Sequence, residues 1–95
     1  MTVRIEKTSN GRSVIIRLVG RIQSRNLDEL KMQIENLGGK VRLDLEEVDL
    51  VDIDAVRFLN ACEAQDVKLL NCPPYIREWM FQERAKEKNT RGDDK

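Results

Sequence analysis

Apolar and polar residues alternate in several stretches of the chain, and this two-residue period predicts β-strands. The first stretch is apolar on one face only, whereas the second is apolar on both faces and favours an interior strand. The predicted strands cover residues 2–7, 13–22, 41–45 and 67–70. Asn10-Gly11 lies between the first two and is typical of a tight hairpin, so we expect these two strands to pair antiparallel.

Three other stretches repeat apolar residues every three or four positions, which is the period of a helix with one buried face. The first helix begins at Asn26, because Asn26 and Glu29 match a capping box, and it ends at Gly38-Gly39. The second helix follows Asp52, a residue typical of an N-cap, and ends near residues 65–66. The apolar positions of the three helices, in chain order, are Leu27, Leu30, Ile34, Leu37, Ala55, Val56, Phe58, Leu59, Cys62, Ile76, Trp79 and Met80.

The third helix begins at Pro73-Pro74, because the missing N–H of proline costs nothing in a first helical turn. We expect residues 1–86 to form one domain and residues 87–95, which contain no large apolar residue, to be a disordered polar tail. The predicted order is strand, strand, helix, strand, helix, strand, helix. This order favours an α/β fold with a mainly parallel four-stranded sheet, right-handed crossovers and an antiparallel first strand.

The charge balance of the chain narrows the classes of function. Its 95 residues include 17 basic and 17 acidic side chains, so the formal net charge is zero. Nucleic-acid binding usually requires a basic face, and this balance argues against it. No apolar run reaches the roughly 20 residues that a membrane span needs, and the N-terminus has no signal-peptide core. We therefore expect a cytoplasmic protein without direct membrane insertion.

Candidate nucleophiles are few. The chain contains no histidine, which excludes Ser/His/Asp and Cys/His arrangements. Cys62 and Cys72 form neither a CxxC pair nor a disulfide framework, so we expect two reduced, inert thiols. Among the aromatic residues of the last helix, Trp79 is expected in the core, while Tyr75 or Phe81 remains exposed.

Six acidic residues and no basic residue lie between Asp44 and Asp54. Asp52 suits an N-cap, and Asp54 complements the positive end of the helix dipole. Their charges would repel a phosphate, which disfavours nucleotide binding at this turn. A divalent metal or acid–base catalysis is a less favoured alternative, because Asp49, Asp52 and Asp54 do not have the spacing of a calcium-binding loop and so small a domain leaves little room for a cleft. We expect no metal, no cofactor and no enzymatic activity.

Four short motifs together point to a known family. Gly20-Arg21-Ile22, followed by Asn26-Leu27, leads into the first helix, and Val41–Leu45 is a strand that contains an aspartate. Asp52–Val56 and Asn71–Pro74 lead into the second and third helices. Over nearly all of the ordered chain this combination resembles the STAS domain, the module shared by anti-sigma-factor antagonists and sulphate transporters. The resemblance implies a STAS-like α/β fold and a role in signalling and regulation.

The resemblance also singles out a switch position. In STAS antagonists, the second Ser or Thr of the turn before the second helix is phosphorylated by a partner kinase, and phosphorylation ends binding to that partner. The matching residue here is Asp54, while Ile53 and Ala55 stand where the family has Ser and Gly. The resemblance therefore implies a docking surface with a fixed carboxylate, which carries one charge against about −1.5 to −2 for a phosphate. The expected partner contacts are Asp52, Ile53, Asp54, Val56 and Arg57.

The partner implied by the resemblance is a protein, namely a kinase-like anti-sigma factor. One alternative is that the chain is an accessory subunit of a lipid-transport ABC system and docks on its ATPase. A second alternative is a small-ligand or nucleotide-binding domain. STAS domains commonly continue with a further strand and helix, whereas this chain continues with polar residues only. We therefore expect the fourth strand to be an open edge that a homodimer or a partner subunit covers, together with the last helix.

Overall fold

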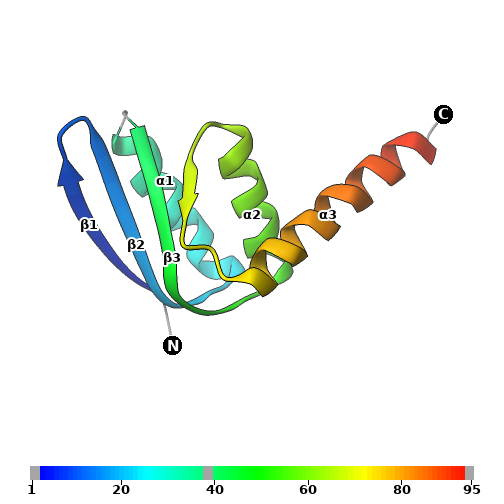
Figure 1. Cartoon of the computed structure of the whole chain (residues 1–95), viewed down its shortest axis with the longest axis horizontal. Helices are drawn as coiled ribbons and strands as arrows, with labels where there is room; N and C mark the ends of the chain where they lie inside the picture. Colours follow the sequence, from blue (N-terminus) through cyan, green and yellow to red (C-terminus); the bar gives the residue numbers. More distant parts are fainter. Residues whose placement is uncertain (1–2, 38–39, 94–95) are drawn as a thin grey trace.

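The computed structural model describes residues 3–37 and 40–93, and within them the side chains of all residues except 10 and 87–93. The order of its elements is the predicted one, with a short 3-10 turn added before the first helix (Figure 1). The elements are β1 (Arg4–Asn10), β2 (Ser13–Ile22), η1 (Ser24–Asn26), α1 (Leu27–Leu37), β3 (Lys40–Val51), α2 (Ile53–Ala64), β4 (Lys68–Leu70) and α3 (Pro74–Asp93).

The four strands form one sheet in the order β1-β2-β3-β4. β1 runs antiparallel to β2, whereas β2, β3 and β4 run parallel to one another. The predicted α/β fold with an antiparallel first strand is therefore confirmed. The hairpin turn lies one residue later than predicted, because Asn10 still pairs with Ser13. Gly11, with a φ of 66°, supplies the left-handed conformation that the turn needs.

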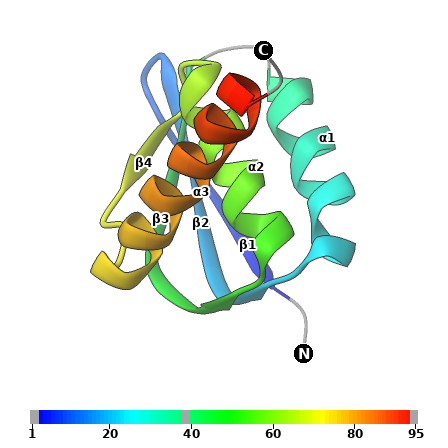
Figure 2. The same ribbon diagram turned by 90° about the vertical axis from the view of Figure 1, so that its right-hand side faces the viewer.

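The hydrophobic core lies between the sheet and the helices. α1 and α2 cover one face of the sheet, and α3 packs against α2 (Figure 2). Burial of each large apolar side chain contributes about 1.5–3 kcal/mol relative to leaving it in water. The buried core residues are Ile16, Leu18, Ile22, Leu27, Leu30, Val41, Leu43, Leu45, Val48, Val51, Ala55, Val56, Phe58, Leu59, Cys62, Ile76 and Met80.

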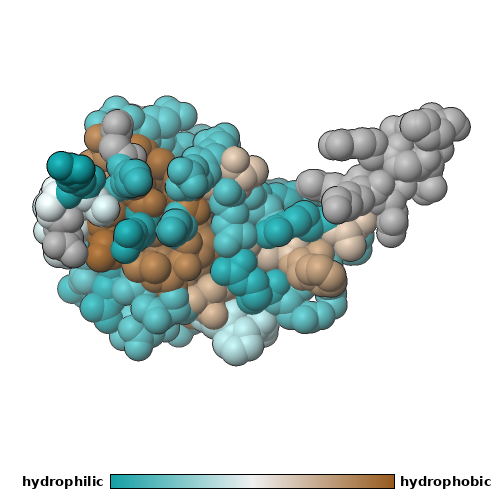
Figure 3. Space-filling view, turned by 45° about the horizontal axis from the view of Figure 1, so that its top comes forward, coloured by the Kyte–Doolittle hydropathy of each residue, from teal (hydrophilic) through white to brown (hydrophobic). Residues whose placement is uncertain are grey.

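The other face of the sheet is covered by no helix of the described residues (Figure 2). Its residues lie side by side across the strands, as the register of Thr8, Ile15, Arg42 and Lys68 shows. Ile15 is half-buried there, in agreement with the two apolar faces predicted for this strand. Figure 3 shows apolar surface on the compact part of the molecule, interrupted by polar side chains.

β3 is longer than the pattern of the sequence predicted. It continues to Val51, so residues 46–51, which we expected as an acidic turn, belong to the sheet. Two register shifts against β2 place additional residues in β3. Beyond Leu45 the buried residues are therefore Val48 and Val51, spaced by three rather than two. These bulges conceal the strand from a simple search for alternation.

The first helix also begins differently from the prediction. Asn26 closes η1, and its Oδ1 accepts a hydrogen bond from the N–H of Gln23 at 2.9 Å. Asn26 therefore serves η1, and α1 starts after it at Leu27 instead of using Asn26 and Glu29 as a capping box. Residues 38–39, the predicted stop, lie outside the described residues.

α3 is longer than predicted and continues to Asp93, beyond the expected end near residue 86. Its last turns contain good helix formers such as Ala, Lys, Glu and Arg but no large apolar residue, so periodicity gave no signal there. Residues 94–95 of the predicted tail lie outside the described residues. Within the described part of the chain, no helix is long and apolar enough to cross a membrane.

Candidate functional site

The start of α2 is held in place by the carboxylate of Asp52. Its Oδ1 accepts a hydrogen bond from the N–H of Ala55 at 2.9 Å, which confirms Asp52 as the N-cap. Its Oδ2 accepts a hydrogen bond from the N–H of Ser24 at 2.8 Å, and its own N–H donates to the carbonyl of Ile22 at 3.3 Å. Both carboxylate oxygens are thus engaged inside the chain, and Asp52 joins α2 to the segment that leads into α1.

The following residues differ in how accessible they are to a partner. Asp54 is exposed in the first turn of α2, and its carboxylate has no ion pair with any described residue. Ile53 is half-buried. Val56 is fully buried, so the expectation that it contacts a partner is wrong. The reason is the helical period, because a helix that begins at Ile53 turns its fourth residue towards the sheet.

Arg57 is exposed but already paired. Its Nε lies 3.4 Å from Oε1 of Glu83 in α3, and Glu83 is only 3% exposed. The Nζ of Lys86 lies 3.4 Å from the other oxygen of the same carboxylate. Glu83 is therefore neutralised from the solvent side by two exposed bases. A partner that binds Arg57 competes with Glu83 for its guanidinium group.

An open hollow lies beside Asp54 and Arg57, where the starts of α1 and α2 meet. Its lining residues are Ser24, Leu27, Asp28, Lys31, Asp54, Arg57, Phe58 and Ala61. Acidic and basic side chains of both helices surround an apolar floor, which suits contact with another protein surface. No pattern in the sequence indicated Asp28 and Lys31, because two charges on the polar side of a helix do not reveal which neighbour they face.

Two exposed apolar residues lie on the other side of the α2 start. Leu50, near the end of β3, is 51% exposed, and Tyr75, in the first turn of α3, is 48% exposed. The hydroxyl of Tyr75 donates a hydrogen bond to the carbonyl of Asp49. Both ribbon views place the end of β3 and the starts of α2 and α3 at the same end of the molecule (Figures 1 and 2).

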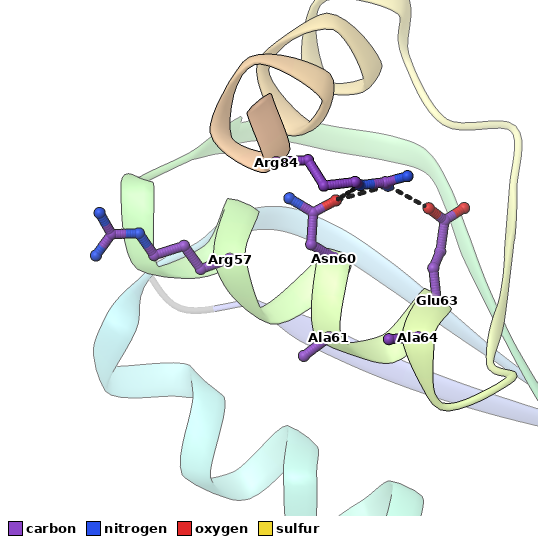
Figure 4. Close-up of a pocket in the computed structure, with 6 residues that line it drawn as sticks. All are labelled: Arg57, Asn60, Ala61, Glu63, Ala64 and Arg84. Atoms are coloured by element: carbon purple, nitrogen blue, oxygen red, sulfur yellow. Dashed lines mark hydrogen bonds and ion pairs between the residues drawn. The ribbon is translucent and has the colours of Figure 1, made fainter. Parts of the chain in front are cut away.

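A second hollow, between α2 and α3, is spanned by a polar clamp (Figure 4). Arg84 donates to Oδ1 of Asn60 at 2.8 Å and lies 2.9 Å from Glu63, while Arg77 lies 2.9 Å from the other oxygen of Glu63. Burial acts to raise the pKa of Glu63, but the hydrogen bonds and charges of Arg77 and Arg84 outweigh it and hold the pKa below its ordinary value. This clamp fixes α3 to α2.

The acidic run does not gather into one site. Asp44 accepts hydrogen bonds from the N–H of Glu46 at 3.1 Å and from the side chain of Asn71 at 3.2 Å. Glu47 pairs with Arg17 at 3.0 Å. Because β3 is extended, its acids are spread along the strand. Among the described residues, no group of three His, Cys, Asp or Glu side chains is close enough to hold a metal ion.

The two thiols are poor nucleophiles at neutral pH. Burial raises the pKa of Cys62 to about 12, with the charge of Glu63 adding to the effect and that of Lys31 opposing it. Cys72 is half-buried, and burial raises the pKa of its thiol as well. Because the thiolate is the reactive form, both side chains act as small apolar residues.

The comparison with solved structures agrees with this fold. No protein-family model matches the chain, and a search of curated proteins finds no match. Among solved structures, the chain is similar to the anti-sigma factor antagonist SpoIIAA in its unphosphorylated form, with a TM-score of 0.60 and 20% sequence identity. The similarity covers 88% of this chain and 81% of that one. The fold is therefore the STAS fold that the motifs predicted.

Proposed function

We propose that this chain is a non-enzymatic, cytoplasmic interaction module that regulates a partner protein by docking on it through the start of α2. The observation that carries the proposal is the exposed carboxylate of Asp54 in the first turn of α2, which forms no ion pair with a described residue, on a STAS fold. By the resemblance of the motif, that position matches the phosphorylated Ser or Thr of STAS antagonists. The similar structure, SpoIIAA, is itself an anti-sigma factor antagonist.

Asp54 makes this surface permanent instead of switchable. A carboxylate does not form the stable phosphate ester that a Ser or Thr hydroxyl forms, and it carries less charge than a phosphate. The neighbouring Ile53 and Ala55 have no hydroxyl either. A partner therefore meets the same charge at this turn under all conditions in which Asp54 is ionised.

The contact surface combines the predicted residues that remain accessible with residues that the fold adds. Ile53, Asp54 and Arg57 face outward or partly outward from α2, and Asp28 and Lys31 of α1 complete the hollow beside them. Asp52 and Val56 support this surface from behind, as cap and core residue. Mixed charges around an apolar floor favour a protein partner over a nucleotide or another strongly anionic ligand.

The partner is proposed to be a kinase-like anti-sigma factor, in keeping with the antagonist whose fold the chain shares. The ATPase of a lipid-transport ABC system is the second candidate partner. Both would use the same surface at the start of α2, so the identity of the captured partner separates these two candidates.

Self-association is a further part of the proposal. β4 is an edge strand of three residues, and Phe81 on α3 is 66% exposed. An open strand edge and an exposed aromatic residue each favour pairing with another chain. We propose that a homodimer forms through β4 and the part of α3 that carries Phe81.

The docking proposal is tested by capture of a partner from native cells with the unaltered chain, followed by titration of the purified partner. We expect Asp54→Ala to weaken binding by about fivefold to tenfold, as for the loss of an interfacial charge contact of about 1–1.4 kcal/mol. Glu35→Ala, which removes an exposed acid of α1, is the matched control and should leave the affinity unchanged. Equal affinities for the Asp54→Ala variant and the unaltered chain would contradict the proposal.

A further inference from the structure

We infer that the docking surface continues beyond α2 onto the Tyr75 patch, defined as Asp49, Leu50 and Tyr75. The Tyr75 patch binds a segment of the partner protein that presents an apolar side chain next to a lysine or arginine. This inference rests on the proposed function, since it names the chemistry of the partner that docks at the start of α2. It adds residues that neither the acidic run nor the switch position indicated.

The first argument is exposure. Four large hydrophobic residues are exposed in the described part of the chain, namely Met32, Leu50, Tyr75 and Phe81. A single exposed apolar side chain is normal in a folded protein, but neighbouring ones at one place indicate a contact surface. Tyr75 is hydrogen-bonded to the backbone of Asp49, the residue directly before Leu50. Two of the four therefore lie at the same end of the molecule as Asp54.

The second argument is that Tyr75 is held in position before any partner arrives. Its hydroxyl donates to the carbonyl of Asp49, which ties the first turn of α3 to the end of β3. The ring is thereby fixed while about half of the residue stays in contact with solvent. Tyrosine side chains that are rigid before binding lose little conformational entropy on binding, and they are common at the centres of protein interfaces.

The third argument is charge. Asp49 is exposed and forms no ion pair with a described residue. Burial raises the pKa of Tyr75, and the negative charge of Asp49 raises it further, while no nearby base lowers it. Among the described residues, Asp49 therefore places a negative charge near the hydroxyl of Tyr75. A lysine or arginine placed over this ring gains both a cation–π contact and an ion pair with Asp49.

The position of Arg21 makes the charge around the Tyr75 patch different on its two sides. Arg21 pairs with Leu50 in the sheet register, so a basic side chain lies on the β2 side of the patch. A base of the partner is therefore favoured on the α3 side, near Asp49 and Tyr75, with the apolar side chain of the partner against Leu50. Opposite charges at the two ends of a contact fix the orientation of the bound segment.

The test uses the full chain with a photo-reactive phenylalanine analogue at position 50, 54 or 32, in cells that produce the protein naturally. We expect positions 50 and 54 to cross-link to the same protein. The partner peptide linked to position 50, identified by mass spectrometry, should contain an apolar residue beside a lysine or arginine. Position 32 is the control, since Met32 is 60% exposed but lies on α1.

Titration of the purified partner then measures how much each residue of the Tyr75 patch contributes to the binding affinity. We expect Tyr75→Ala to weaken binding about 30-fold, which is the loss typical of a central aromatic contact. Asp49→Asn should weaken binding about tenfold at low salt and have little effect at high salt, because salt screens the ion pair. Asp49→Asn leaves the carbonyl that Tyr75 binds in place. Leu50→Glu, a second variant at an exposed position, should also weaken binding. Met32→Ala is the control and should leave the affinity unchanged.

The outcomes separate this inference from the proposed function. Cross-linking from position 54 but not from position 50, with unaltered affinity of the Tyr75→Ala and Leu50→Glu variants, overturns the inference and leaves the proposed function standing. An absence of cross-linking at both positions overturns both. Cross-linking of position 50 to a second copy of this chain, or to a partner peptide without a basic residue, overturns the assigned partner chemistry.

Discussion

Asp52 and Asp54 lie two residues apart, yet the fold surrounds their carboxylates differently. Asp52 accepts hydrogen bonds from the N–H groups of Ala55 and Ser24, whereas Asp54 is exposed and unpaired among the described residues. The first carboxylate therefore contributes to folding and the second is available for contact. Substitution of the two residues should separate stability from binding.

We predict that Asp52→Ala lowers the free energy of unfolding by about 1–2 kcal/mol, because α2 loses its N-cap and the N–H of Ser24 loses its acceptor. Urea denaturation followed by circular dichroism measures this change. Asp54→Ala is the control, and it should cost about 0.3–1 kcal/mol, through the helix dipole alone. If Asp54→Ala destabilised the chain as strongly as Asp52→Ala, the separation of roles would be wrong.

Residue type was a good guide where the interaction is local. Asp52 was predicted as an N-cap because its carboxylate, the acceptor, lies within one helical turn of the donor, the N–H of Ala55. Val56 was misassigned because the switch motif, and not the helical period, selected it. The pairing of Arg57 with Glu83 could not be predicted, since it depends on how α3 crosses α2 and no local pattern records that angle.

At the scale of elements, amphipathic helices were easier to predict than strands with bulges. α2 and the start of α3 lie where the apolar period and the prolines placed them. The predicted range of β3 was too short, because two bulges change the spacing of its buried residues from two to three. The strand nevertheless continues, because backbone hydrogen bonds to β2 hold it through the irregular stretch.

The polar clamp between α2 and α3 predicts a pH dependence. The pKa of Glu63 is lower in the folded chain than its ordinary value of 4.5. Ionised Glu63 therefore stabilises the fold fully above its unfolded pKa, and this contribution is lost as the pH falls through the lower, folded pKa. We predict that Glu63→Gln lowers the stability at pH 7 and weakens the loss of stability below about pH 4.5.

Unfolding of the Glu63→Gln variant in urea at a series of pH values between neutral and acidic measures this effect. Glu35→Gln is the matched control, because Glu35 is an exposed acid of α1 outside the clamp. The control should keep the pH profile of the unaltered chain. A Glu63→Gln variant with that same profile would show that the clamp does not contribute to the stability of the fold.

At the scale of the whole molecule, the mainly parallel sheet with an antiparallel first strand followed from the sequence, because few topologies fit alternating strands and helices. The pattern could not show that one face of the sheet lacks a helix, because Ile15 and its neighbours are apolar enough for an interior strand. The hydrogen bond from Tyr75 to the backbone of Asp49 could not be predicted either, since it forms only when the end of β3 and the start of α3 come to the same end of the molecule.

We predict concentration-dependent self-association through β4 and α3. Sedimentation velocity over a wide concentration range should show a dimer for the unaltered chain. Phe81→Ser should shift the equilibrium towards the monomer by about tenfold, because it removes the large exposed apolar residue of this surface. Met32→Ser, on α1, is the control and should not alter the equilibrium. A monomer at all concentrations would contradict the prediction.

The Arg57–Glu83 ion pair connects α2, which carries the proposed docking surface, with α3, which carries the proposed dimer surface. Arg57 belongs to the docking helix, and its counter-charge Glu83 is buried on α3, the helix proposed to form part of the dimer surface. A partner that draws Arg57 away leaves a buried carboxylate with less compensation, which weakens the attachment of α3. Thermodynamic reciprocity then requires that whatever fixes α3 in place also changes the affinity at the start of α2 by the same factor. Under the two proposals, this one ion pair makes occupancy at one surface a determinant of occupancy at the other.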